Sequence, residues 1–344
     1  MTLLERRGLR PLPTWFGTAL AASIFLFVTA FPEAAQHPVP SGTKSYRVGI
    51  VLPGDEWLSS VEGMKEGMKT LGYVEGKEIY YLFENAKGDK KKVAEMTRRF
   101  VGERVDAIFT ITNTALKVVA AETRESKTPV IFGSASGPVE SGIIPAYATP
   151  DSHITGVTSN SIELVGKRLE ILKEVLPQVR RVAVIGDRDA DSSIKAFAIA
   201  KATAPKVRLS LVEIKAGSKE EAIEAAKKLS RSDADAIFLI PSLHVVGSTP
   251  EIAAAARAAR LPFVVYQIEH VEKNGALIGY GSSYFLQGKQ SAKLLSKVLK
   301  GVKPGAIPIE TPERFVLTLN LVIAKAIGLK IPRDVLARAD RTVE

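Results

Sequence analysis

The sequence predicts an α/β protein made of two doubly wound, Rossmann-like lobes, each built on a parallel sheet. Two observations predict it: strand-like and helix-like runs alternate along the chain, and the second half repeats the first. The length points the same way, because 344 residues exceed what one hydrophobic core usually serves.

The alternation is clearest in the first half of the chain. Tyr46–Leu52 is a short run of β-branched and apolar residues, and Glu56–Leu71 then carries apolar residues at helical spacing. Further strands are expected at Glu78–Phe83, Val105–Ile111 and Pro129–Phe132, with helices at Lys90–Val101 and Thr114–Glu125. The strands are continuously apolar, which is typical of parallel sheets covered by helices on both faces.

Four short segments of the first half recur in the second half, in the same order and about 130 residues later. The matching pairs are residues 47–51 with 181–185, 84–88 with 213–217, 105–109 with 234–238, and 128–132 with 261–265. Four matches in order indicate two lobes of one topology. Two such lobes leave a cleft between them, and open α/β sheets bind ligands at the carboxyl ends of their strands.

Composition excludes several classes of protein and site. The chain has no cysteine, so it has no disulfide, no cysteine-based zinc site, no thiol nucleophile and no lipid-modified cysteine. The net charge of +10 comes from lysines and arginines spread along the chain, mostly beside acidic residues. This pattern indicates a basic solvated surface with a mild attraction for anions, and it does not indicate nucleic-acid binding.

The first 35 residues have the features of a secretory signal peptide. Three arginines precede an apolar stretch at residues 15–31, and small residues follow it. Cleavage after Ala30 and cleavage after Ala35 both fit, and an uncleaved membrane anchor is the alternative. Residues 36–45 contain proline and glycine and are expected to form a flexible leader. The chain is therefore expected to be exported to the periplasm.

Polar and aromatic residues follow the predicted strands and are the candidates for ligand contact. The candidates are Trp57, Thr112, Asn113, Thr114, Ser134, Ser136, Asp189, Ser242, His244, Tyr266, Gln267, Ser283 and Tyr284. Trp57 is either a stacking wall for a flat solute or the first core residue of its helix. Residues 112–114 are either a helix cap or donors to a ligand carboxylate.

The sequence contains no recognisable catalytic motif, so it predicts neither an enzyme nor a metal or cofactor site. The four histidines, at positions 37, 153, 244 and 270, lack metal-ligand spacing. No glycine-rich phosphate loop occurs. Residues 133–137 look like a nucleophile elbow, but Ala135 stands where that motif needs serine.

Several landmarks resemble a known family. They are residues 71–77 (LGYVEGK), 153–157 (HITGV), 284–288 (YFLQG), 299–304 (LKGVKP) and 307–312 (IPIETP). Together they resemble the ABC transporter substrate-binding family that includes tryptophan and tyrosine uptake proteins, over roughly residues 46–332.

The resemblance implies the type 1 periplasmic binding protein fold, with three chain crossings near Ser159, Ser282 and Pro308. The first lobe would comprise residues 46–158 and 283–306, and the second 159–282 and 307–340. The implied function is the extracytoplasmic solute-binding component of an ABC importer. It would close on a small molecule by a hinge motion, act as a monomer and deliver its solute to an inner-membrane permease.

Two other functions stay open at this stage. One is a periplasmic sensing subunit for a membrane kinase or chemoreceptor, on the same fold. The other is an exported hydrolase on an α/β scaffold.

The chain departs from the family where members that bind amino acids carry acidic residues. Their Thr-Asp-Pro turn is here Ser136-Gly137-Pro138, and their Asp-Asn pair is here Leu243-His244. Their Glu-x-Asn-Ser loop is here residues 189–192 (DADS). A carboxylate to pair with a substrate ammonium is thus missing at Gly137 and Leu243, and an unpaired buried ammonium is expensive. A carboxylate-bearing or neutral aromatic solute fits better than a zwitterion.

Overall fold

The computed structural model describes residues 44–148, 152–242 and 245–344. The signal peptide and most of the leader lie outside this part of the chain, as do Leu243 and His244. Lys44–Glu344 forms one compact unit with two sheets. No helix in the described segments is long and apolar enough to cross a membrane.

The first sheet has five parallel strands in the order β2-β1-β3-β4-β5. Their bounds are β1 Tyr46–Leu52, β2 Ile79–Asn85, β3 Ala107–Ile111, β4 Val130–Ala135 and β5 Ile154–Thr158. The second sheet has seven strands in the order β12-β11-β10-β9-β8-β6-β7. Their bounds are β6 Arg181–Asp187, β7 Ser210–Ala216, β8 Ala236–Leu239, β9 Phe263–Val265, β10 Ile278–Gly281, β11 Val316–Asn320 and β12 Arg341–Val343.

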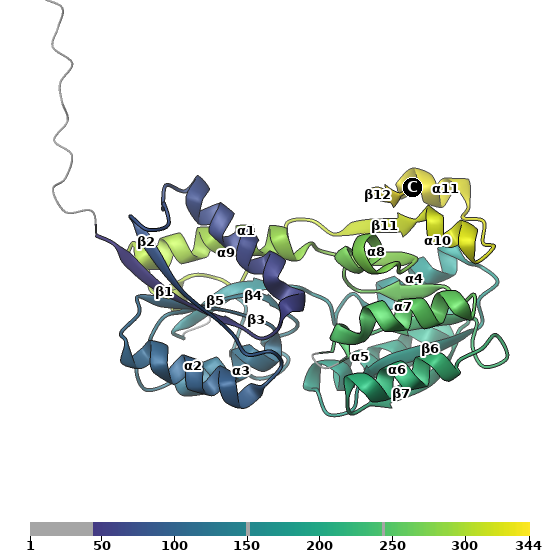
Figure 1. Cartoon of the computed structure of the whole chain (residues 1–344), viewed down its shortest axis with the longest axis horizontal. Coiled ribbons are helices and arrows are strands. Elements are labelled where there is room, and N and C mark those ends of the chain that lie inside the picture. The colour runs from purple at the N-terminus through teal and green to yellow at the C-terminus, as the bar shows by residue number, and fades with distance from the viewer. Residues whose placement is uncertain (1–43, 149–151, 243–244) are drawn as a thin grey trace, which may run out of the picture. The chain divides into compact units, whose positions relative to one another are not determined.

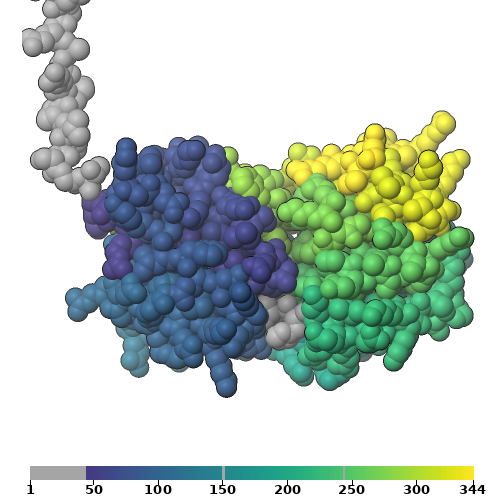
Figure 2. Space-filling view, viewed as in Figure 1, coloured from purple at the N-terminus to yellow at the C-terminus, as the bar shows by residue number. Residues whose placement is uncertain are grey.

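The strand orders confirm the duplicated topology expected from the sequence. Read from one edge, β2-β1-β3-β4-β5 corresponds to β7-β6-β8-β9-β10. The second sheet then adds β11, which is antiparallel to β10, and the short β12. Figure 2 shows the C-terminal residues, in yellow, on the surface of the molecule. The expected α/β architecture of two lobes with parallel sheets is confirmed, apart from β11 and β12, which run antiparallel to the other five strands of the second sheet.

Helices cover the first sheet on both faces (Figure 1). One layer consists of α1 (Leu58–Thr70) and α9 (Tyr284–Leu299), and the other of α2 (Lys90–Gly102) and α3 (Asn113–Glu122). The expected helix at 56–71 is divided in two, because the 3₁₀ turn η1 (Asp55–Trp57) precedes α1. Strand β3, which is apolar except for Thr110, is buried between these layers.

The second sheet carries the remaining helices. They are α4 Val165–Val175, α5 Asp191–Thr203, α6 Lys219–Lys228, α7 Thr249–Ala258, α8 Glu269–Asn274, α10 Leu321–Ala326 and α11 Arg333–Arg338. Short 3₁₀ turns lie at η2 Ala204–Val207, η3 Val246–Ser248 and η4 Pro304–Ala306. Asn320 caps the start of α10, since its side chain accepts a hydrogen bond from the N–H of Ile323 at 2.9 Å.

Helix α9 is distant in sequence from the first sheet, yet it packs against α1 and β4. Glycine makes this approach possible. A Cβ atom at Gly288 would lie 1.9 Å from the Ser60 carbonyl oxygen, and one at Gly63 would lie 2.0 Å from the Phe285 carbonyl oxygen. The start of α9 is therefore held firmly beside α1, and the residues that precede it are brought to the carboxyl ends of both sets of strands.

The residue numbers at which the sequence analysis divides the lobes stay a prediction. One set of contacts bears on the third crossing. Thr155 Oγ1 donates to the Ile307 carbonyl at 3.0 Å, and the Glu310 N–H donates to the Gly156 carbonyl at 3.0 Å. These bonds hold residues 307–310 beside β5, which favours a crossing slightly later than Pro308.

Candidate functional site: a pocket at the strand ends

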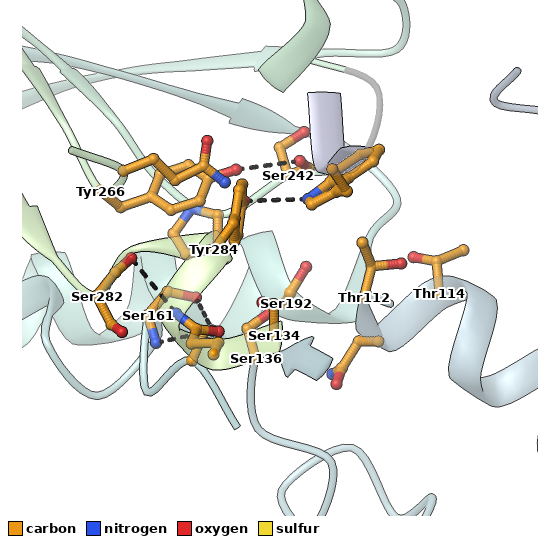
Figure 3. Close-up of a pocket in the computed structure, with 16 residues that line it drawn as sticks. Thr112, Thr114, Ser134, Ser136, Ser161, Ser192, Ser242, Tyr266, Ser282 and Tyr284 are labelled. Atoms are coloured by element: carbon orange, nitrogen blue, oxygen red, sulfur yellow. Dashed lines mark hydrogen bonds between the residues drawn. The ribbon is translucent and has the colours of Figure 1, made fainter. Parts of the chain in front are cut away.

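A pocket lies where the carboxyl ends of the two sheets meet (Figure 3). It holds about 500 Å³ of space not filled by atoms, counting the part open to solvent. Its lining is Trp57, Thr112, Asn113, Thr114, Ser134, Ser136, Ser159, Ser161, Ser192, Pro241, Ser242, Tyr266, Gln267, Ser282, Tyr284 and Gln287.

Ten of the residues that the sequence singled out lie together in this lining. They are Trp57, Thr112, Asn113, Thr114, Ser134, Ser136, Ser242, Tyr266, Gln267 and Tyr284. Their convergence follows from the fold, because the loops after β3, β4, β8 and β9 all open at the carboxyl edge of a parallel sheet. Whether they contact a ligand stays a prediction.

Three candidates are placed differently. Asp189 lines an adjoining hollow together with Lys90 and Asp191, and this hollow shares Asn113, Thr114 and Ser192 with the pocket. Ser283 is the buried residue that precedes α9, and it does not belong to the lining. His244 lies outside the described residues.

Sequence reasoning missed five lining residues: Ser159, Ser161, Ser192, Pro241 and Gln287. Ser159 was expected only as a crossing point, whereas Ser282 was expected at a crossing where the chain touches either the solute or the hinge. Gln287 had a usable signal, since it lies three residues after Tyr284 and therefore on the same face of α9. The others follow strands or begin helices, where serine and proline are too common to stand out.

Three aromatic rings form the apolar part of the lining. Trp57 Nε1 donates a hydrogen bond to the Tyr284 hydroxyl at 3.0 Å, and Tyr266 donates to the Ser242 carbonyl at 3.4 Å. Trp57 is also part of the buried core, which confirms one of its two sequence interpretations, and stacking against a solute stays a prediction. Burial raises the pKa of Tyr266 to about 12 and that of Tyr284 still further. Both phenols therefore remain protonated at neutral pH.

Five polar atoms of the lining are buried without a hydrogen-bond partner among the described residues. They are Asn113 Oδ1, Ser134 Oγ, Gln267 Nε2, Gln267 Oε1 and Gln287 Oε1. Leaving such a group unpaired costs about 1–3 kcal/mol. Five in one pocket indicate that something with both donors and acceptors completes the site.

Two residues of the lining have strained backbones. Thr112 has φ 73° and ψ 154°, a region that a β-branched residue rarely adopts, and Ser134 has φ 56°. Such conformations cost about 1–3 kcal/mol each and cluster at functional sites. The strain at Thr112 places its hydroxyl at the start of α3, where it accepts from the Ala115 N–H at 3.3 Å.

The lining carries no charged side chain in the part of the chain that the structure describes. Nor do the described residues contain a group of three or more side chains able to hold a metal ion. With rings, hydroxyls and amides, the pocket is equipped for recognition by stacking and hydrogen bonding.

A comparison with protein families decides the identity. The profile of the ABC transporter substrate binding proteins matches residues 47–343. The chain belongs to this family. The resemblance seen in the sequence is confirmed, and the protein is a solute-binding component of an ABC transporter. As in this family generally, its partners are a small-molecule solute and a permease, and its place of action is extracytoplasmic.

Individual relatives agree with the family. A tyrosine-binding protein of Clostridioides difficile (strain R20291) is 24% identical over 270 residues, which cover 78% of this chain and 76% of that protein. A Streptococcus pneumoniae ABC domain solved with L-Trp is 22% identical, covering 87% of this chain and all of that one, with a TM-score of 0.80. A conserved domain protein of Vibrio cholerae is 25% identical, covering 88% and 100%, with a TM-score of 0.81.

Proposed function

We propose that this substrate-binding protein captures a flat, aromatic solute that has hydrogen-bonding groups at its edge and no free ammonium group. The observation that carries the proposal is the set of five unpartnered polar atoms beside the three aromatic rings, in a pocket without charged side chains. The three rings favour a flat ring as solute, and the unpartnered atoms favour a solute with both donors and acceptors.

The proposal of an aromatic solute is supported by the rings that line the pocket and by the names of the relatives. Trp57, Tyr266 and Tyr284 present large apolar surfaces, and rings of this kind stack on or pack edge-to-face against a flat solute. The relatives support this, since the names of two of them mention tyrosine and L-Trp.

The proposal that the solute has no ammonium group is based on the charged groups around the pocket. A zwitterionic amino acid would bring an ammonium into the pocket, and a buried ammonium needs a carboxylate partner. Gly137, one of the two positions where the carboxylate is missing, has φ 77°. A Cβ atom added there would lie 2.9 Å from Glu140 Oε2, so a larger side chain at this position would be strained. Glu56 and Glu269 act through space on the Tyr284 hydroxyl, but neither belongs to the lining. Burial also raises the pKa of Glu269, which favours its neutral form.

Capture would proceed by closure of the two lobes on the solute. Elements of both sheets already meet beside the pocket. Lys117 of α3 pairs with Asp191 of α5 at 3.0 Å, and Glu56 of η1 lies against Gly247 of η3. A solute that contacts both sets of strand ends stabilises the closed arrangement by the contacts that the open one lacks.

Three finer features belong to the same proposal. Residues 1–35 direct export to the periplasm and are removed. The mature protein acts as a monomer. It performs no catalysis, because the motifs for a nucleophile and base are missing from the sequence.

The test compares one ring system in three charge states: indole-3-acetate, indole-3-acetamide and tryptophan, with a hexose as a fourth solute. A ligand at 100-fold its Kd stabilises the folded protein by about 2.7 kcal/mol, which corresponds to a rise in Tm of about 5 °C. We expect the acetate or the amide to raise Tm, and tryptophan and the hexose to have little effect. A shift with tryptophan alone, or with the hexose alone, would overturn the proposal.

A further inference from the structure

Arg168 of α4 is fully buried, with 0% of its surface exposed, although it does not line the pocket. Its Nε donates to the Tyr280 carbonyl at 2.6 Å, and its Nη1 donates to the Ser161 carbonyl at 2.7 Å. The guanidinium carbon lies 5.8 Å from the centre of the Tyr266 ring. Ser161 and Tyr266 both line the pocket, so a single layer of residues separates this charge from the pocket.

The charge of Arg168 has no counter-ion among the described residues. No carboxylate lies within ion-pair distance of it, and Nη2 has no hydrogen-bond partner. A buried cation without an anion is costly. Burial disfavours the charged form of Arg168 and lowers its pKa to about 9. At neutral pH the side chain still carries its full charge.

An anion in the pocket would compensate this charge. Interactions across a dry protein wall are screened less than those in water. A carboxylate of the solute would therefore gain from Arg168 without touching it. A neutral solute of the same shape would make the same stacking contacts but gain nothing from the charge.

We propose that Arg168 is a specificity-determining residue that acts through the pocket wall and makes an aromatic monocarboxylate the preferred solute. The inference rests on the proposed function, because it requires that the pocket takes a flat aromatic molecule. It goes further by assigning the charge of that molecule to one residue that does not line the pocket.

Other titratable groups face Arg168 and must be weighed against it. They are Glu163 before α4, Tyr266 after β9, Tyr280 of β10 and Tyr284 of α9. Glu163 acts on Arg168 through space but makes no ion pair with it, and partial burial raises the pKa of Glu163, which favours its neutral form. The pKa values of Tyr266 and Tyr284 are raised by burial, so these phenols stay neutral through the range in which Arg168 titrates.

A purely structural role is the rival explanation. By bonding to Ser161 and Tyr280, Arg168 ties together two segments that lie next to lobe crossings. Loss of that tie would distort the pocket for every solute. The two roles differ in one measurable respect: the structural role affects acid and amide equally, and the electrostatic role affects the acid alone.

The experiment measures Kd for indole-3-acetate and indole-3-acetamide by calorimetry, with wild type, Arg168→Gln and Arg168→Lys. We expect the wild type to bind the acid at least about tenfold tighter than the amide at pH 7. Arg168→Gln should lose this ratio while keeping the amide Kd within about twofold, and Arg168→Lys should keep part of it. The control Arg338→Gln removes an exposed arginine that pairs with Glu174, and it should leave the ratio unchanged.

A second arm needs no variant and so survives if Arg168→Gln fails to fold. In wild type the acid should bind tighter than the amide, and equally well throughout about pH 6 to 8, where Arg168 is charged. Binding of the amide should stay flat over the same range. Any loss that the acid and the amide share would belong to the tyrosines or to the fold.

The outcomes are distinct. Equal loss of acid and amide in Arg168→Gln, or an acid-to-amide ratio near one in wild type, would overturn the inference and leave the proposed function standing. Failure of the wild type to bind either probe would overturn the proposed function itself.

Discussion

Trp57 and Tyr284 are 227 positions apart in the chain and share a buried hydrogen bond of 3.0 Å, from the indole Nε1 to the phenol oxygen. The bond joins η1, which follows the first strand, to the first residue of α9. Both side chains line the pocket, so the bond holds the start of α9 against the part of the pocket that Trp57 forms.

Tyr284→Phe should lower the free energy of unfolding by about 1–3 kcal/mol, because it leaves the indole N–H buried and unpaired. The double variant Trp57→Phe/Tyr284→Phe should cost less than the sum of the single variants. Urea denaturation measures both. Tyr73→Phe is the matched control, since the Tyr73 hydroxyl bonds Ser296 at 3.3 Å but lies outside the lining. Tyr73→Phe should lower the free energy of unfolding without changing solute affinity. If it changed solute affinity as much as Tyr284→Phe does, the placement of Tyr284 at the binding site would be contradicted.

Gln267→Leu should weaken solute binding about tenfold while leaving the stability of the empty protein unchanged or higher. Both amide atoms of Gln267 are buried without partners, so an apolar side chain of similar volume removes an existing cost. The comparison is Gln290→Leu, whose Nε2 bonds Glu310 at 2.7 Å and the Thr311 carbonyl at 3.0 Å. That variant should lose stability. A marked loss of stability in Gln267→Leu would mean that this amide serves the fold.

Gly288→Ala should destabilise the protein by about 2 kcal/mol or more, because its Cβ would lie 1.9 Å from the Ser60 carbonyl oxygen and the helices must move apart. Gly102→Ala is the control at the end of α2, where a new Cβ meets nothing within 4 Å. There alanine should be neutral or slightly stabilising. Thermal unfolding of the two variants distinguishes them, and equal Tm values would show that α1 and α9 are not tightly packed in solution.

The Lys117–Asp191 ion pair should contribute little to the stability of the protein, although it joins α3 to α5. Both side chains are mostly exposed, 64% and 53%, and such pairs give about 0–1 kcal/mol. A double-mutant cycle of the two alanine variants should show a coupling energy below about 1 kcal/mol that disappears in high salt. A larger coupling that survives high salt would show that this pair holds the lobes together.

The stability of the protein should fall as pH drops from about 6.5 towards 4. Burial lowers the pKa of His270 from 6.5 to about 4, so in this range the unfolded chain binds a proton that the folded protein does not. The full loss is about 3 kcal/mol at the low end. Unfolding free energies of wild type and His270→Gln at pH 7 and pH 4.5 measure it. An equally steep decline in the variant would assign the acid sensitivity to other groups.

Much of the fold was predictable from local pattern. Tyr46–Leu52 was expected as a strand at the same bounds that the structure gives β1, because a continuous apolar run between polar segments has few other readings. Strand β4 runs three residues further than expected, to Ala135, because Ser134 accommodates a positive φ within it. Hydrophobic periodicity carries no information about such a local distortion.

The site was predictable in part for the same reason. Thr112 and Tyr266 follow strands, and strand ends in parallel sheets meet at one edge, so position in the repeat was enough to find them. Arg168 could not be found in this way. It stands beside Lys167 in a charged segment, and only the packing of α4 against β10 shows that one of these two neighbours is buried and the other exposed.

The sequence alone determined the repeated α/β plan, the family and the polar character of the strand ends, because these depend on local propensity, spacing and motifs. The tertiary structure decided which of those polar groups share a pocket, which are left unpaired, and that a charge without a partner lies behind the wall. The physical reason is that burial and pairing arise from contacts between distant segments, such as α9 with α1 and Arg168 with Tyr280, and no local pattern encodes them.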